Sequence, residues 1–289
     1  MRTVLRSHIL LLLLLAVGPL QAAEHLRYPR PLPGLEHRND YILALLQLAL
    51  DKAGSSRQLL PSDHHMEQSR ALRELQQNRS VDVVWSMTSN EREAQLRPIR
   101  FPLDKGLLGW RLALVKKQAR QPLAAVDDLQ DLTQLRAGQG HDWPDTQILS
   151  ENGLPVVTSA SYPSLFRMLD AGRFEYFPRS LLEIWEEADQ PQNRALQVDP
   201  NLLLLYPTAF YFFVAPDNQA LAEELQQGLE RALADGSFDR LFFAYYGDAL
   251  KRARLSERHL IELDNPLLPA ATPLERAELW LSRDQLLKR

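Results

Sequence analysis

The feature that most constrains the fold is a short β-branched run that ends in polar side chains. It reads Val81-Asp82-Val83-Val84-Trp85-Ser86-Met87-Thr88-Ser89-Asn90-Glu91-Arg92. A short apolar run of this kind predicts a buried strand, and Arg92 follows the hydroxyl residues by about one helical turn. Open α/β sheets bind ligands at the carboxyl ends of their strands. The segment therefore predicts an α/β fold with a polar ligand site just after the strand.

The rest of the chain alternates between strand and helix patterns. Strands are predicted at 26–30, 58–60, 107–115, 155–158, 174–177 and 202–214, and helices at 39–53, 66–78, 162–171, 181–187, 220–234 and 238–246. Such alternation favours a parallel or mixed sheet covered by helices. The fold class is therefore α/β.

The first 22 residues have the pattern of a secretory signal peptide. Arg2 and Arg6 precede an apolar run at 9–17, and Leu20-Gln21-Ala22-Ala23 supplies small residues at the exit. We expect cleavage after Ala22 and export to the periplasm. The alternative is an uncleaved anchor, but the run falls short of the ~20 apolar residues that span a bilayer. With no cysteine at the exit, a lipoprotein anchor is not expected.

Composition excludes several classes of function. The chain has 0 cysteines, so it has neither a catalytic thiol nor a cysteine metal site. Without Arg2 and Arg6, its 33 basic residues become 31 against 37 acidic ones, a formal charge of −6. Nucleic-acid binding needs a concentrated basic face, which is absent. The adjacent His64 and His65 have no third ligand at a useful spacing, so no metal and no cofactor is expected.

A second motif gives the sequence a family resemblance. Asp235-Gly236-Ser237-Phe238-Asp239-Arg240-Leu241 follows a long helical pattern. With the earlier strand, these residues resemble the periplasmic solute-binding proteins of the polar amino-acid class, in which a "DV" strand leads into a "T-x-E-R" turn and a late helix ends in "DGS". The resemblance covers most of 24–247. It implies a type 2, two-lobed fold in which each lobe is a mixed sheet flanked by helices.

The resemblance also implies a domain layout. Lobe 1 is discontinuous, at 23–110 and 209–247, and lobe 2 occupies 111–208. Two hinge crossings, near 107–115 and 204–214, join the lobes and let them close around a solute. Residues 248–289 are expected to form a helical tail that packs on lobe 1.

Three expected site residues lie in the first motif. The resemblance implies that Arg92 grips a ligand carboxylate, since its planar fork matches two carboxylate oxygens. The alternative is a helix-start arginine paired with Glu91 or Glu93. Thr88 and Ser89 would add hydroxyl donors. Tyr28, near the end of the first strand, corresponds to an aromatic residue that stacks on ligand.

A glycine turn supplies a second group of site residues. Gly140 and His141 precede a predicted helix, where backbone N–H groups can bind an anion. In the resembled family the glycine is followed by threonine or serine, which His141 replaces here. The alternative is an ordinary strand-to-helix turn without a ligand. Trp143 is expected either to stack on the solute or to cover the helix start.

Arg179 is the main departure from the family. Amino-acid binders place an aspartate near this strand end to hold the ligand's ammonium group, and this chain has a cation instead. A cation there would repel an ammonium group and favour a second anionic group, so we expect an organic acid, dicarboxylate or other small anionic metabolite rather than a plain amino acid. The alternative is that Arg179 points to solvent beside Glu183.

Three functions follow for the chain. The leading hypothesis is a monomeric, non-catalytic solute-binding protein that captures a small anionic or amino-acid-like solute and presents it to a membrane permease or sensor receptor. The second is a partner or signalling protein with a vestigial cleft, which an apolar, plugged cleft would support. The third is a dehydratase-like enzyme, with Glu175, His141 or Asp142 as its acid or base.

Overall fold

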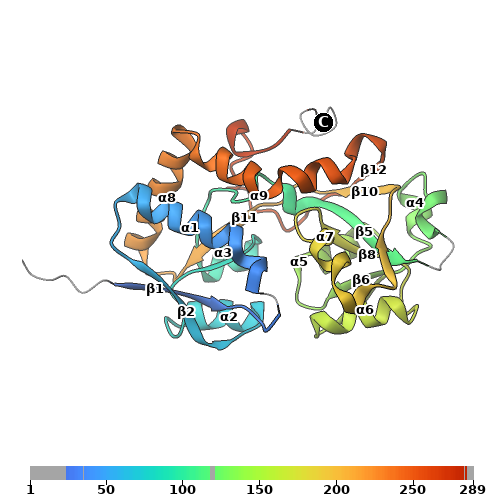
Figure 1. Ribbon diagram of the computed structural model, residues 1–289, viewed down its shortest axis with the longest axis horizontal. Coiled ribbons are helices and arrows are strands. Elements are labelled where there is room, and N and C mark those ends of the chain that lie inside the picture. The colour runs from blue at the N-terminus through green and yellow to red at the C-terminus, as the bar shows by residue number, and fades with distance from the viewer. Residues whose placement is uncertain (1–23, 35, 118–120, 283, 285–289) are drawn as a thin grey trace, which may run out of the picture.

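A computed structural model describes residues 24–34, 36–117, 121–282 and 284 of the chain. Figure 1 shows two lobes side by side, with the N-terminal elements in one lobe and the middle of the chain in the other. The predicted signal peptide lies outside the described residues. Within the described residues, no helix is both long and apolar enough to cross a membrane.

Lobe 1 contains two small sheets with helices packed on them. Strands β1 (His25–Arg30) and β2 (Gln58–His65) pair in parallel, and β3 (Val84–Met87) and β4 (Arg97–Ile99) flank β11 (Phe210–Val214) as antiparallel partners. The helices are α1 (Asp40–Ala53), α2 (Gln68–Gln76), α3 (Asn90–Gln95) and α8 (Gln219–Ala234). The run at 81–84 is therefore buried as predicted and leads directly into β3.

Lobe 2 is built around a mixed sheet. Its path is β12 (His259–Glu262), then β10, β5 and β8, with β9 (Leu196–Val198) also paired to β5 (Trp110–Lys116). Strand β8 spans Phe177–Ser180 and β10 spans Leu202–Leu205. A parallel pair, β6 (Ala137–Gly140) and β7 (Val156–Ser159), lies beside it. The helices are α4 (Leu129–Leu132), α5 (Pro144–Glu151), α6 (Tyr162–Asp170) and α7 (Ile184–Asp189).

Two of the passages of the chain between the lobes touch each other. One runs from β4 to β5 through the 3-10 helix Leu107–Gly109, and the other runs from β10 to β11. Tyr206 N donates to Gly109 O at 3.2 Å, and a Cβ on Gly109 would lie 2.1 Å from Tyr206 O. Only glycine allows this close approach. We refer to residues 103–109 and 206–209 as the two crossings.

The prediction of a helical tail packed on lobe 1 is wrong in part. Helix α9 (Ser237–Ala253) continues past Gly247, and β12 (His259–Glu262) then joins the lobe 2 sheet, parallel to β10. The chain returns to lobe 1 only after β12, first at Leu267, whose O accepts from Asn90 N, and then at the 3-10 helix Ala277–Leu279. A four-residue strand with one buried side chain, Ile261, gives too short a pattern for a sequence prediction.

Candidate functional site

A cleft of about 530 Å³ lies between the lobes and takes side chains from both. Lobe 1 contributes Arg30, Gln68 and Trp85, among others. The lobe 2 wall carries charged side chains from β5, α5 and β8, and the α9 residues Tyr245 and Tyr246 form part of one side. The cleft is large enough for a small metabolite and has polar groups on facing walls, as ligand sites do.

Arg111 is one of two buried arginines on the lobe 2 wall. It lies on β5, only 3% exposed, and its Nη2 is 2.5 Å from Asp145 Oδ1. Its Nη1 is 3.6 Å from Glu183 Oε1, and Asp145 also accepts a hydrogen bond from the Tyr206 hydroxyl. Burial acts to lower the pKa of Arg111, but the neighbouring carboxylates, Asp145 above all, outweigh it and raise that pKa. Arg111 is therefore a fixed cation whose charge is already compensated.

Arg179 is the second buried arginine and is held even more firmly. Its Nε and Nη2 donate to the two oxygens of Glu187, at 2.8 and 2.6 Å, and Nη2 is 2.8 Å from Glu183 Oε1. The rings of Trp143 and Phe177 lie 4.9 Å from its guanidinium carbon. Burial acts to lower its pKa, but these carboxylates outweigh it and hold that pKa well above its usual value.

Arg179 lines the cleft, and its expected contact with a ligand stays a prediction, whereas the solvent-facing alternative is wrong. It is 2% exposed, so it does not point to solvent, and Glu183 and Glu187 compensate its charge. The physical reason is the strand boundary. Strand β8 covers 177–180 rather than 174–177, which puts Arg179 inside a fully buried strand. A buried guanidinium needs carboxylate partners, and the next helical turns supply them.

The lobe 2 wall has a small surplus of negative charge. The guanidinium groups of Arg111 and Arg179 meet the carboxylates of Asp145, Glu183 and Glu187, so two cations face three anions and the cluster has a formal charge of −1. Among the residues that line the whole cleft, three arginines face five carboxyl groups. Arg179 therefore does not present an uncompensated positive charge that would exclude an ammonium group from the cleft.

The residues of the first motif, 81–92, lie near the cleft, but its predicted site residues make hydrogen bonds within lobe 1. Thr88 Oγ1 donates to Glu93 Oε1 at 2.6 Å, and Ser89 caps α3 by accepting from Arg92 N at 3.2 Å. Arg92 Nη1 donates to Ser86 Oγ and Met87 O at 2.7 and 2.8 Å, and its Nη2 donates to Gln68 Oε1 at 3.0 Å. None of Thr88, Ser89 and Arg92 lines the cleft, whereas Gln68 does. Arg92 therefore lies one side chain behind the cleft surface.

The predicted site residues of the glycine turn, Gly140, His141 and Trp143, also lie only partly in the cleft. His141 N donates to Ser159 O at 3.1 Å, so this N–H is already used, and the exposed His141 side chain does not line the cleft. The Trp143 ring covers Gly140, because a Cβ there would lie 2.5 Å from it. Trp143 itself lines the cleft and stacks on Phe177 at 6.3 Å. Of these three residues, only Trp143 reaches the cleft.

Tyr28 packs within lobe 1 and does not line the cleft. Its ring lies 6.1 Å from that of Trp85, which does line it. Tyr28 therefore supports an aromatic wall of the cleft. Trp85, rather than Tyr28, is the aromatic residue placed to contact a ligand in the cleft.

Sequence reasoning missed the residues that form the charged wall. Arg111, Asp145 and Glu183 were not predicted as site residues, and neither was Asp104. A signal existed for two of them. Arg111 is a lone charge in the otherwise apolar strand pattern of 107–115, and Asp145 follows Pro144 at a helix start. Buried charges in such positions need partners and commonly mark functional sites.

Asp104, on the first crossing, also lines the cleft and is 1% exposed. Its carboxylate accepts hydrogen bonds from Gly106 N at 3.1 Å and Leu108 N at 2.8 Å. Burial nevertheless raises its pKa to about 7 from the usual 3.8. Over this range the folded protein keeps a proton that the unfolded chain has released. Its free energy of unfolding should therefore fall as the pH rises.

The expected fall from Asp104 is on the order of 4 kcal/mol between pH 4 and 7, at about 1.4 kcal/mol for each pKa unit. Urea denaturation at a series of pH values measures it. Asp104→Asn keeps an acceptor but cannot titrate, so its curve should lack this fall, whereas Asp248→Asn, at an exposed site, should follow wild type. Parallel curves for wild type and Asp104→Asn would show that Asp104 is not responsible.

The expected acid–base residues do not gather in the cleft. Glu175 bonds Arg136 in a bidentate pair, whose hydrogen bond holds the pKa of that carboxyl below its usual value. Asp142 accepts a hydrogen bond from Ser69 of lobe 1, and neither Asp142, Glu175 nor His141 is among the cleft-lining residues. Within the described ranges, no group of three or more His, Asp or Glu side chains is arranged so that it could hold a metal ion, and His65 Nδ1 faces Pro31 O.

Comparison with known proteins settles the fold. No protein-family profile and no curated protein sequence matches the chain. Solved structures do match: an ancestral arginine-binding protein bound to arginine aligns with 78% of this chain and 98% of its own, at 17% identity and a TM-score of 0.58. The chain has the type 2 periplasmic-binding-protein fold. The α/β, two-lobed prediction is confirmed.

Two further solved structures share this binding-protein fold. A histidine kinase sensor domain with similarity to periplasmic binding proteins matches 78% of this chain and 96% of its own, at 15% identity and a TM-score of 0.58. The periplasmic VFT2 domain of Bordetella pertussis BvgS matches 77% and 93%, at 14% identity and 0.61. At these identities the likeness establishes the fold alone.

Proposed function

We propose that this protein is an exported receptor that holds a small amino-acid-like solute between its lobes and presents it to a transporter or a sensor. The observation that carries the proposal is the cleft of about 530 Å³, whose two walls belong to different lobes and carry charged and aromatic side chains. The binding-protein fold and the signal-peptide pattern at 1–22 support it. A cleft with polar walls argues against the vestigial alternative.

The charges favour a solute with an ammonium group. With Arg111 and Arg179 compensated, the lobe 2 wall offers a surplus carboxylate to the cleft. Glu183 lies between the two arginines and is 16% exposed, so it is the carboxylate that we assign to the solute's ammonium group. A carboxylate on the same solute would face lobe 1, where Gln68 covers Arg92.

Binding would work through differential affinity for lobe arrangements. A solute that contacts both walls stabilises the arrangement in which both are within reach, and it can do so only by as much as its contacts differ between arrangements. The lobes already meet directly, because Ser69 on α2 donates to Asp142 in the turn before α5. A permease or sensor would then bind the solute-loaded form.

Thermal denaturation of the mature chain against amino acids, amines and organic acids tests this proposal. A solute at 100 times its dissociation constant adds about 2.7 kcal/mol to the free energy of unfolding. We expect a raised midpoint with an ammonium-bearing solute and at least a roughly tenfold weaker affinity in Glu183→Gln, from loss of a charged hydrogen bond. Glu151→Gln, on an exposed face of α5, is the matched control. A response to organic acids alone would contradict the assignment.

A further inference from the structure

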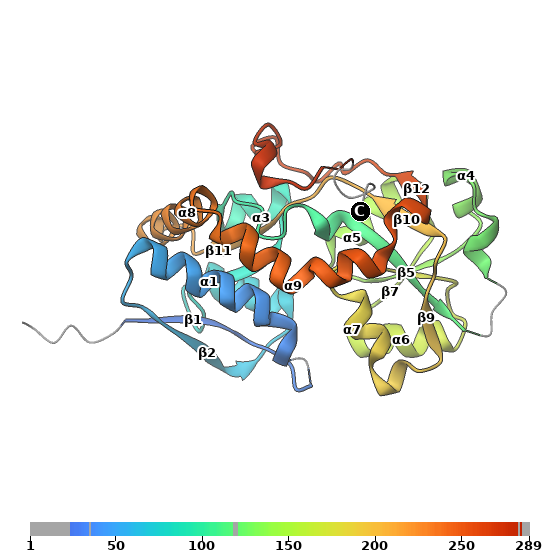
Figure 2. The ribbon, with the colours of Figure 1, turned by 45° about the horizontal axis from the view of Figure 1, so that its top comes forward.

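Helix α9 contacts both lobes along its length. Its residues from Phe238 to Tyr246 pack on lobe 1, where the ring centroids of Phe238 and Phe101 lie 4.9 Å apart and those of Tyr246 and Tyr41 lie 4.7 Å apart. Near its end, Arg252 pairs with Asp189 of α7 at 3.0 Å. Figures 1 and 2 both show this helix running from α8 in lobe 1 toward β10 and β12 in lobe 2. One continuous helix therefore spans the cleft.

Arg258 fixes the end of this helix to lobe 2. Its Nε donates to Ala253 O, in the last turn of α9, at 2.7 Å. Its Nη1 donates to Asp199 O at 2.6 Å and to Leu202 O at 3.2 Å, at the start of β10. One guanidinium group thus joins the carboxyl end of the helix to the lobe 2 sheet.

The chain then continues along lobe 2 and the second crossing. Strand β12 pairs with β10 from Leu202↔His259 to Leu205↔Glu262. Asp264 exchanges two hydrogen bonds with Asn152, after α5, at 2.8 and 3.0 Å. Asn265 Nδ2 donates to Pro207 O on the second crossing at 2.8 Å.

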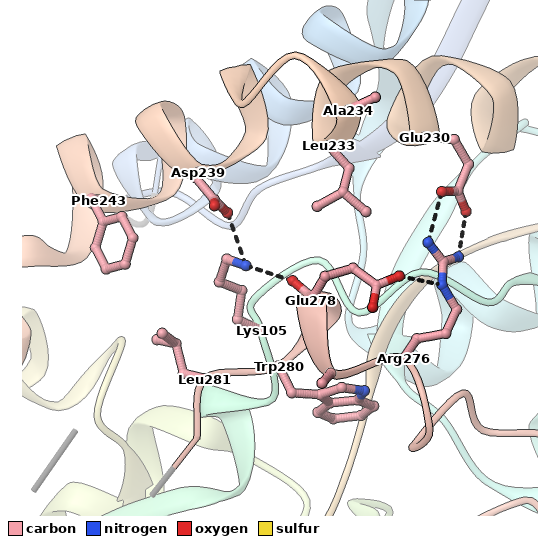
Figure 3. A pocket seen from close by; sticks show the side chains of 11 residues that line it. Lys105, Glu230, Leu233, Ala234, Asp239, Phe243, Arg276, Glu278, Trp280 and Leu281 are labelled. Atoms are coloured by element: carbon pink, nitrogen blue, oxygen red, sulfur yellow. Dashed lines mark hydrogen bonds and ion pairs between the residues drawn. The ribbon is translucent and has the colours of Figure 1, made fainter. Parts of the chain in front are cut away.

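The remaining residues attach to lobe 1 and the first crossing. Asn90 N, at the start of α3, donates to Leu267 O at 3.2 Å, and Arg276 bonds both oxygens of Glu230 on α8 at 2.6 and 2.9 Å. Figure 3 shows this ion pair beside Lys105, whose Nζ donates to Glu278 O at 3.0 Å. Lys105 O in turn accepts from Leu281 N at 3.0 Å.

We propose that residues 237–282, here called the brace, hold the two lobes at a restricted angle before any solute arrives. Hinge closure changes backbone angles at the crossings, and the brace is hydrogen-bonded to both crossings and to both lobes. Opening the lobes must break part of this set. If the proposed function holds, the brace keeps the cleft in its binding-competent arrangement and spares the solute the free energy of selecting it.

Interlobe distances in the solute-free protein test the brace. The sequence has 0 cysteines, so Gln76→Cys on lobe 1 and Ala171→Cys on lobe 2 give two unique spin-label sites. Both positions are exposed, at the ends of α2 and α6. Double electron–electron resonance between the labels should give one narrow distance distribution in the otherwise wild-type protein.

Two variants release the brace to different degrees. Arg258→Ala removes the link between α9 and β10, and Asn152→Ala with Asn265→Ala removes side-chain bonds without touching a core residue. Lys251→Ala is the matched control, because Lys251 pairs with Asp248 on the same helix and both side chains are largely exposed. Circular dichroism confirms folding, and the double asparagine variant decides the question if Arg258→Ala does not fold.

We expect both brace variants to show a broader distribution with longer distances, and Lys251→Ala to match wild type. The proposal is overturned if wild type already populates two separated distances, or if the folded double asparagine variant keeps the wild-type distribution. The measurement uses no solute, so it stands apart from the proposed function. Failure to find a solute would contradict the proposed function without affecting the proposal for the brace. A wide distance distribution in the wild-type protein would contradict the brace without affecting the proposed function.

Discussion

Replacing Arg179 with methionine is expected to lower the free energy of unfolding by about 3–5 kcal/mol, the usual cost of removing one partner from a buried ion pair. Methionine fills most of the same volume, so the loss comes from charge. Without the guanidinium group, Glu187 loses both of its hydrogen bonds from Arg179 and Glu183 loses its 2.8 Å partner. Urea denaturation monitored by circular dichroism measures the change, because the linear extrapolation gives the free energy in water.

A matched control exists elsewhere in lobe 2. Arg136 makes the same two-bond contact with Glu175, but its side chain is 49% exposed and water can solvate both charges after truncation. Arg136→Met should therefore change stability little. Equal losses in the two variants would mean that burial of Arg179 does not decide its contribution. A loss below about 1 kcal/mol in Arg179→Met would contradict the account of the lobe 2 wall.

Replacing Gly228 with valine is the second large effect we expect. Gly228 lies on the face of α8 that packs on α1, and a Cβ there would lie 1.9 Å from Ala49 O. A backbone oxygen inside a helix cannot turn away, so the two helices must separate and open the core around Leu45 and Leu225. The expected loss is roughly 3 kcal/mol or more, at the upper end of what overpacking costs.

Gly247 provides the comparison for Gly228. It also lies inside a long helix, α9, but a Cβ there meets nothing within 4 Å. Gly247→Ala should raise the free energy of unfolding by about 0.5–1 kcal/mol, because alanine loses less backbone entropy in a helix. Thermal denaturation of both variants measures the contrast. If both substitutions changed the free energy of unfolding in the same direction, the contact between α1 and α8 would not explain the effect of Gly228→Val.

The fold could be predicted from sequence because its signals are local. The strand that contains Trp85, the helix that ends before Gly54 and the Asp235-Gly236-Ser237 turn each follow from neighbouring residues, and their order sets the topology. The structure of the chain after Gly247 was harder to predict from the sequence. Strand β12 forms because it pairs with β10, and a four-residue segment is too short for its hydrophobic pattern to predict a parallel pairing.

The ion pairs of the lobe 2 wall were difficult to predict from the sequence for a related reason. Arg111 and Asp145 are 34 positions apart in sequence and meet only when β5 and α5 pack together. For Arg179 the partners Glu183 and Glu187 were visible at four and eight positions along the chain. Placing the strand three residues too early hid the fact that the guanidinium group is buried. Charge balance in a buried site depends on where each element begins, which sequence patterns set least well.

The central claim is that the cleft binds an ammonium-bearing solute at Glu183. Calorimetric titration of the mature protein tests it most directly, with the zwitterionic amino acids and the matching carboxylic acids that lack the amine as paired titrants. The account predicts saturable binding of one solute per chain for at least one amino acid, none for its deaminated partner, and a loss of affinity in Glu183→Gln but not in Glu151→Gln. Binding of the deaminated acid with equal affinity, or unchanged binding in Glu183→Gln, would contradict it.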